Sequence, residues 1–309
     1  MTNIVNKGNL IRLAGIIGGF AVGQILLLTG VIDSFLFLNV VTIGINIILA
    51  VSLNLITGYT GQFSLGHAAF MAIGAYASGL LTARLGMPFI VGILGAAVMA
   101  ALAGILIGIP TLRLKGDYLA IATLGFGEIV RILGLNWDYA GGAMGLNDIP
   151  RYTTWFWLYT MMVVTIIVIT NFIRSYNGRA VISIREDEIA SASMGVNTAY
   201  YKVLAFTIGA MFAGVGGALY ANFFYFIKPD SFGFMKSVDI LVIVVLGGLG
   251  SIRGSVVAAI VLSLVSLALQ GIPELRMVIY AVLLFIMMVY KPQRLLHKLA
   301  GMFRKEAKA

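Results

Sequence analysis

Long apolar runs fill this chain and leave few residues for a surface that faces water. Of its 309 residues, 60% are hydrophobic and 11% are charged, whereas soluble domains carry about 25% charged residues. Backbone that crosses lipid must satisfy its own hydrogen bonds, which favours helices. The chain is therefore predicted to be an all-α, polytopic membrane protein with a single transmembrane domain over residues 1–309.

The apolar runs divide into about ten predicted spans, each near the length of about 20 residues that a bilayer requires. The first run is too long for a typical signal peptide and no clear cleavage site follows, so it is predicted to remain as a span. The run at 237–249 is short, and a re-entrant half-helix or a short true span would fit it. The expected spans are 13–32, 35–56, 62–83, 88–109, 118–136, 155–173, 201–222, 237–249, 254–271 and 277–290.

Basic residues are spread unevenly over the predicted loops. If the N-terminus lies in the cytoplasm, most Lys and Arg fall on the cytoplasmic side, as the positive-inside rule requires. Both termini, including a basic tail at 291–309, are then cytoplasmic, and this distribution favours a true span at 237–249. The net charge of +9 is thus explained by membrane orientation, and nucleic-acid binding is not expected.

A polar, glycine-containing stretch separates the second and third predicted spans. Gln62, Ser64 and His67 lie near the expected start of the third helix. They indicate either a broken helix beside a translocation path or an ordinary cytoplasmic turn, and the sequence leaves both open. Small residues then recur at helical spacing and predict a face for close helix packing: Ala68, Ala72, Ala75 and Gly79.

Two opposite charges lie within the predicted span 118–136. Glu128 and Arg131 are three residues apart, so they can pair on one helix face. Charges inside a membrane span indicate a functional site, but a structural ion pair near the outer interface is the favoured interpretation here. Glu128 is kept with Gln62, Ser64 and His67 as a candidate for the translocation path.

A charged loop at about 174–200 lies between two apolar runs and is predicted to be cytoplasmic. Asn177 and Gly178 are expected to end the preceding helix, and a helix of two to three turns should follow. Gly195 fits the position after that helix, and Asn197 can cap the next one. The segment is either a docking site for a partner or a solvated connector. Its predicted apolar or small face comprises Ile182, Ile189, Ala190, Ser193 and Met194.

Catalytic signatures are absent from the sequence. The chain has no cysteine, which excludes disulfides and cysteine-based metal sites. It has no phosphate-binding loop and no zinc-protease or serine-hydrolase motif. Neither a catalytic residue nor a metal site is therefore predicted, and the chain is not expected to be an enzyme.

Four motifs, in this order, resemble the M-type (Liv) permease subunits of branched-chain amino-acid ABC importers over about residues 46–291. Together they are specific, although none of them would be so alone. They are Thr57-Gly-Tyr-Thr-Gly-Gln-Phe-Ser-Leu-Gly-His67, the run 112–126 from Leu-Arg-Leu-Lys-Gly-Asp to Gly-Phe, the loop 178–196 with Arg185-Glu-Asp-Glu-Ile-Ala190, and Leu246-Gly-Gly-Leu-Gly-Ser251 with Gly254.

The resemblance implies a bacterial or archaeal inner-membrane permease and identifies the charged loop as its ATPase-coupling segment. The implied partners are a second, H-type permease subunit, two ATP-binding subunits and an external substrate-binding protein. ATP and Mg would be used by those partners, with no cofactor bound by this chain. The implied coupling residues are Arg185, Glu188, Ala190 and Gly195. Here Ile189 interrupts the family's Glu-Ala-Ala pattern, and the Glu-to-Gly spacing is one residue longer.

Two alternatives remain at this point. Related permeases move urea, short amides or other amino acids, and nothing in the chain separates these from leucine, isoleucine and valine. A secondary transporter driven by an ion gradient, with Glu128 or His67 carrying protons, would also lack a phosphate-binding loop.

Overall fold

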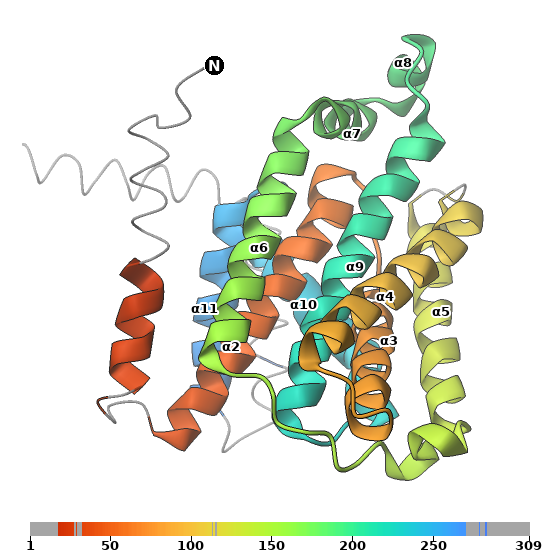
Figure 1. Cartoon of the computed structure of the whole chain (residues 1–309). Coiled ribbons are helices and arrows are strands. Elements are labelled where there is room, and N and C mark those ends of the chain that lie inside the picture. Colours follow the sequence, from red (N-terminus) through yellow and green to blue (C-terminus); the bar gives the residue numbers. More distant parts are fainter. Residues whose placement is uncertain are drawn as a thin grey trace, which may run out of the picture.

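The computed structural model describes residues 18–27, 29, 33–112, 114, 116–269, 278 and 282. These residues form a bundle of helices joined by loops, with no β-strand among them (Figure 1). A single isolated β-bridge in this part joins Leu146 to Ile227. The all-α prediction is therefore confirmed for the described part of the chain.

Five helices in the described part are long and apolar enough to cross a membrane. Each coincides within a few residues with a predicted span, which supports a multi-pass membrane protein. One continuous helix, Ser34–Tyr59, consists of α2 (Ser34–Leu53) and the π-helical η1 (Asn54–Tyr59). The other four are α4 (Phe89–Thr111), α5 (Asp117–Leu135), α6 (Trp155–Arg174) and α9 (Thr198–Phe224).

Shorter helices complete the bundle. They are Gly18–Leu27, α3 (His67–Gly79) with its extension η2 (Leu80–Arg84), α7 (Tyr176–Glu186), α8 (Glu188–Ser193), α10 (Phe234–Gly247) and α11 (Ile252–Ala268). Three short 3₁₀ segments lie in loops: η3 (Asp138–Ala140), η4 (Gly142–Met144) and η5 (Pro229–Phe232). The span 13–32 is described only in part, and 277–290 lies outside the described residues except 278 and 282. The total of about ten transmembrane helices therefore stays a prediction.

The third predicted span was wrong at its start. The expected helix began at 62, but residues 60–66 are not helical and α3 begins at His67. Gly61 has a φ of +73°, outside the right-handed helical region. The polar stretch thus forms a non-helical connection between η1 and α3.

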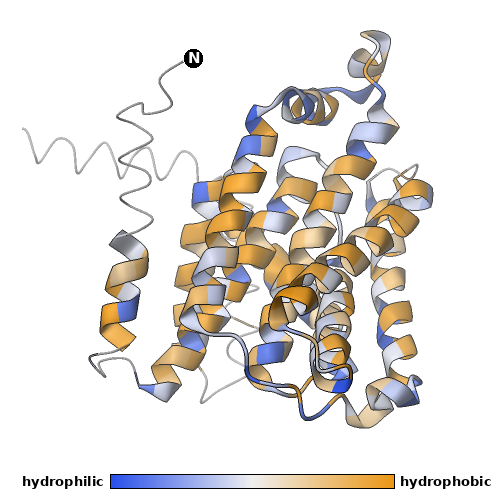
Figure 2. Ribbon diagram, in the orientation of Figure 1, coloured by the Kyte–Doolittle hydropathy of each residue, from blue (hydrophilic) through white to orange (hydrophobic). Residues whose placement is uncertain are grey.

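Helix α9 lies at the centre, packed against α2, α3 and α4. Helices α10 and α11 form a hairpin against α2, and α5 packs against α3 and η5. Helices α7 and α8 lie together at one end of the bundle, which we call the α7–α8 end (Figure 1). Hydrophobic residues cover the long helices, whereas hydrophilic residues gather mainly near the ends and in α7 (Figure 2).

Small residues allow α3, α4 and α9 to approach closely. The predicted face of α3 is buried, with Ala68 and Ala75 fully inaccessible. A methyl carbon on Gly217 of α9 would lie 2.0 Å from the carbonyl oxygen of Met71 in α3. Backbone-to-backbone contact of this kind is how helices associate in lipid, where apolar surface gives little driving force.

Replacing Gly217 with alanine should therefore destabilise the bundle. The added methyl group must push α3 and α9 apart, and overpacking of a tight core costs about 1–3 kcal/mol. We expect a lower melting temperature in detergent, measured by loss of monodisperse protein on heating. Gly125→Ala in α5 is the matched control, because a methyl carbon on Gly125 would have no atom within 4 Å. Equal melting temperatures for the two variants would contradict this packing.

Candidate functional site

Two short helices, rather than one, form the charged segment between α6 and α9. Helix α6 ends at Arg174, and Ser175 is extended and caps α7 by accepting a hydrogen bond from the Gly178 amide (3.3 Å). Asp187 then separates α7 from α8 and accepts bonds from the amides of Ile189 (2.9 Å) and Ala190 (3.0 Å). These two caps keep the short helices in place although neither would be stable alone.

The predicted break at Asn177 and Gly178 was therefore wrong, because both residues lie inside α7. A methyl carbon on Gly178 would lie 2.2 Å from the carbonyl oxygen of Ile173, at the end of α6. Gly178 thus serves the close crossing of α6 and α7, while Ser175 makes the turn. Two other predictions are confirmed: Gly195 follows α8 with a φ of +84°, and Asn197 caps α9 through the Tyr200 amide (3.1 Å).

Two of the predicted coupling residues form hydrogen bonds or ion pairs with other residues of this chain. The Arg185 Nη1 atom donates to the carbonyl oxygen of Gly58 in η1 at 2.9 Å, and the same guanidinium pairs with Glu186. The Nζ atom of Lys202, which is nearly buried in α9, lies 2.6 Å from Glu188 Oε1. Arg185 and Glu188 therefore fasten α7 and α8 to the membrane helices.

The remaining predicted coupling residues, Ala190 and Gly195, are exposed. Beside them, Ile189 is 75% exposed and Met194 is 85% exposed. Of the predicted apolar face, the α8 part thus points away from the bundle, while α7 buries Val181 and Ile184 instead. The segment has one side bonded to the protein and one apolar side without a partner in the described structure.

The Gly58 carbonyl belongs to a junction of three segments at the α7–α8 end. In the same η1 turn, Asn54 donates to Ser255 Oγ (2.9 Å) and accepts from the Gly250 amide (2.9 Å). Gly250 lies in the turn between α10 and α11 and has a φ of +81°. The side chain of Arg185 approaches the same glycine. We call this contact set, formed by Arg185, Gly58, Asn54, Gly250 and Ser255, the η1 junction.

The non-helical stretch 60–66 follows the η1 junction and leads to α3. Its Leu65 amide donates to Thr123 Oγ1 (3.0 Å), and His67 Nε2 lies 2.9 Å from Ser52 Oγ. At 1.5 Å per residue, both partners lie about 10 Å along their helices from the α7–α8 end. The stretch 60–66 is therefore a break between two helices that is held against α2 and α5, with Gln62 and Ser64 buried and Gly61 and Phe63 exposed. The two interpretations of this break, a place beside a translocation path and a cytoplasmic turn, both stay predictions.

The predicted path residues of this stretch are all buried: Gln62 is 3% exposed, Ser64 is 1% exposed and His67 is inaccessible. Neither polar side-chain atom of Gln62 has a hydrogen-bond partner among the described residues, and His67 Nδ1 has none either. Their role in a translocation path stays a prediction.

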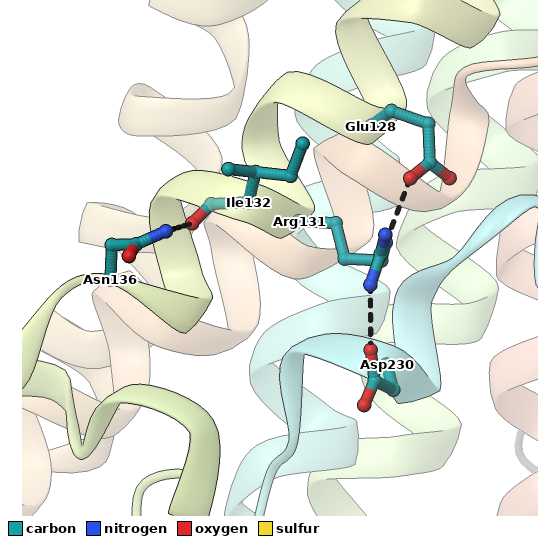
Figure 3. Close-up of polar contacts among 5 residues, drawn as sticks. All are labelled: Glu128, Arg131, Ile132, Asn136 and Asp230. Atoms are coloured by element: carbon teal, nitrogen blue, oxygen red, sulfur yellow. Dashed lines mark hydrogen bonds and ion pairs between the residues drawn. The ribbon is translucent and has the colours of Figure 1, made fainter.

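Glu128 lies apart from these residues, towards the opposite end of α5. Its Oε2 atom lies 2.8 Å from Nε of Arg131, so the predicted ion pair is confirmed. Nη1 of Arg131 also lies 2.9 Å from Oδ1 of Asp230, which comes from η5 (Figure 3). The sequence did not reveal Asp230 as a partner, because 99 positions separate it from Arg131.

These charges line a cavity of about 480 Å³ between α5, η5 and the start of α10. We call it the charged cavity. None of Gln62, Ser64 and His67 lines it. The described residues contain no group of three or more His, Asp or Glu side chains that could hold a metal ion. The lining residues are Glu128, Arg131, Asp230, Ser231, Gly233, Phe234, Met235, Lys236 and Asp239.

Comparison with known proteins gives consistent matches. The family model described as "Branched-chain amino acid transport system / permease component" matches residues 35–288. The high-affinity branched-chain amino acid transport system permease protein LivM of Escherichia coli K12 is 40% identical over 287 residues, covering 82% of this chain and 68% of that protein. LivM of Salmonella typhimurium is 39% identical with the same coverage. The corresponding LivH of Escherichia coli K12 is 28% identical over 256 residues, covering 73% of this chain and 82% of LivH. No solved structure matches the chain.

Loss of the Arg185 bond should loosen η1 locally. A hydrogen bond to a charged group is worth about 1.5–3 kcal/mol, and partial exposure of Arg185 favours the lower end. Arg185→Met should therefore accelerate amide hydrogen exchange in residues 57–62 about tenfold. Arg179→Met, in the same helix, removes an exposed guanidinium that, among the described residues, donates a hydrogen bond to the carbonyl oxygen of neighbouring Arg174 (3.4 Å). Equal exchange rates in the two variants would contradict the role assigned to Arg185.

Proposed function

This chain belongs to the family of branched-chain amino acid transport system permease components, and we propose from this premise how it works in such a system. It is the transmembrane permease subunit of an ATP-driven importer for branched-chain amino acids. A second permease subunit of the H type completes the translocation path with it. The similarity to LivH proteins supports that pairing.

The exposed apolar side of α8 carries the proposal. Ile189 in this six-residue helix and Met194 just after it are exposed apolar side chains on a segment that is bonded to α9 and η1. A partner that covered them would remove apolar surface from water. The chain has no phosphate-binding loop, so energy from ATP must enter through another subunit. We therefore assign α8 as the surface on which an ATP-binding subunit docks.

The positive-inside distribution of Lys and Arg supports a cytoplasmic location for the α7–α8 end. Both chain termini are assigned to the same side. The opposite end, with η4 and η5, then faces the external substrate-binding protein. This orientation places the two ATP-binding subunits and the binding protein on opposite faces of the bundle, as an importer requires.

The structure supports a direct route for movement from α8 into the membrane. When ATP binding moves the partner subunits, α8 pulls on α9 through the Glu188–Lys202 pair. Helix α7 pulls on η1 through Arg185 and Gly58. Both contacts are charge-assisted and therefore strong. The interrupted helix and the α10–α11 turn then move with the coupling helices as a rigid body.

An ion-gradient-driven mechanism receives no support from the geometry. Glu128 is held by Arg131, and His67 is enclosed against Ser52. An inaccessible His67 does not suit a residue that must exchange protons with water, and the Glu128 carboxylate is engaged in an ion pair. Among ATP-driven substrates, the matched family favours branched-chain amino acids over urea and amides.

The energy for transport should come from ATP and not from an ion gradient. Proteoliposomes containing this chain, the H-type subunit and the ATP-binding subunits should accumulate radiolabelled leucine only with internal ATP and external loaded binding protein. An uncoupler should leave uptake unchanged. Uptake that persists without ATP, or that collapses with an uncoupler while ATP remains, would refute the proposal.

Docking on α8 can be mapped with single cysteines because the chain contains none. Ile189→Cys should react rapidly with a maleimide in the isolated permease pair and at least about tenfold more slowly once the ATP-binding subunits are bound, because burial excludes the reagent. Met144→Cys is the matched control: Met144 is 81% exposed and lies at the opposite end, in η4. Equal labelling of Ile189→Cys with and without those subunits would exclude α8 as the docking surface.

A further inference from the structure

The charged cavity lies where the last turns of α5, the loop segment η5 and the first turns of α10 meet. Glu128 and Arg131 lie within α5, and Lys236 and Asp239 lie within α10. Glu128 and Arg131 are partly exposed, with side chains 39% and 29% accessible. Charged groups in contact with lipid are costly, so such residues face a bundle interior or a water-filled space. The cavity therefore opens towards water or the second permease subunit rather than towards lipid.

One side of the cavity suits a carboxylate. Arg131 uses Nε for Glu128 and Nη1 for Asp230, and its Nη2 atom has no hydrogen bond within the described chain. The N-terminus of α10 forms the adjacent wall, with Gly233 as its cap residue and no side chain bonded to the first amides. A methyl carbon on Gly233 would lie 3.8 Å from Cδ of Arg131, so the two features adjoin. A guanidinium beside an uncapped helix N-terminus is a good site for an anion.

The other side suits an ammonium group. Glu128, Asp230 and Asp239 all line the cavity, and Asp230 is 68% exposed. With Arg131 and Lys236, the lining holds three acidic and two basic side chains, of which Lys236 also donates to Asn46 Oδ1 (3.3 Å). Both signs of charge thus lie within one space. A ligand with a single charge would match only part of this lining, whereas a zwitterion matches both.

The cavity also has an apolar edge and adequate size. Phe234 and Met235, the first residues of α10, are 41% and 58% exposed at its wall. Small-molecule sites usually occupy about 300–1,000 Å³, and the cavity of about 480 Å³ falls within this range. An aliphatic side chain could rest on Phe234 and Met235 while the charged groups of the same molecule meet the polar lining.

We propose that the charged cavity is an entry site for the zwitterionic α-amino acid group of the substrate. Arg131 and the α10 N-terminus bind its carboxylate, and Glu128 with Asp230 binds its ammonium. The ligand's carboxylate replaces Asp230 as the second partner of Arg131, because Asp230 is the more exposed of the two acidic partners. This inference rests on the proposed function for the identity of the substrate.

The direct test is equilibrium binding of radiolabelled leucine to the purified complex with the H-type and ATP-binding subunits. Arg131→Gln should weaken binding about tenfold or more, since it removes charge-assisted bonds. Glu128→Gln, which keeps the size of the side chain, should also weaken it. Arg151→Gln is the matched control, because Arg151 is stacked on the Phe223 ring outside the cavity (4.7 Å). Unchanged binding in both cavity variants would overturn the proposal.

Displacement of bound leucine by unlabelled analogues distinguishes a site for a zwitterion from a site for a single charge. Unlabelled valine should displace leucine, whereas leucinamide, which lacks the carboxylate, and 4-methylpentanoate, which lacks the ammonium, should not. Displacement by either single-charge analogue as effectively as by valine would overturn the inference.

The two proposals can fail separately. If the unmodified complex imports leucine with ATP while the cavity variants bind it normally, only the cavity assignment fails. If the unmodified complex shows no ATP-dependent import, the proposed function fails first. A variant that misfolds is recognised by its melting temperature, and the other cavity variant then decides.

Discussion

Backbone groups that leave a helix must find other hydrogen-bond partners, and the structure depends on how this chain meets that requirement between α2 and α3. The helix passes into π-helical η1 and then into the non-helical stretch 60–66. The amides and carbonyls released there are bonded by other segments: Arg185 from α7, Thr123 from α5 and Ser237 from α10, which accepts from the Ala68 amide at 3.1 Å. An interruption that would be prohibitive in lipid is thus stabilised by three helices at once.

The same bonds explain why four separated motifs belong to one function. The stretch after η1, the start of α5, the α7–α8 segment and the α10–α11 turn all meet at or near the interrupted helix. Asn54 and Gly250 secure the turn, and Arg185 secures the coupling helix. Because each bond joins different helices, movement of α7 must either carry η1 with it or break a charge-assisted contact. The apolar side of α8 is exposed in the described structure, so under the proposed function docking and transmission would use opposite sides of the same short segment.

Features that depend on neighbouring residues could be predicted from the sequence. Apolar runs predicted the long helices, and Gly195 and Asn197 were placed correctly because helix caps are local. The Glu128–Arg131 pair followed from its helical spacing. The start of α3, the extra partner Asp230 and the inward direction of Arg185 could not be predicted, because each depends on a contact between distant segments. The turn after α6 is made by Ser175, whereas Asn177 and Gly178 lie inside α7. Gly178 is needed there because α7 passes close to the end of α6. The sequence pattern of a turn does not distinguish a residue needed for φ from one needed for close approach.

The central claim is that Arg185 transmits movement of the coupling helices to the interrupted membrane helix. The most direct measurement is the number of ATP molecules hydrolysed per leucine imported by reconstituted complexes with Arg185→Met, compared with the unmodified chain and Arg179→Met. Since Arg185→Met leaves α8 and its exposed side intact, the account predicts that hydrolysis continues while import falls, so the ratio rises several-fold for this variant alone. An unchanged ratio, with import and hydrolysis reduced in parallel or not at all, would contradict it.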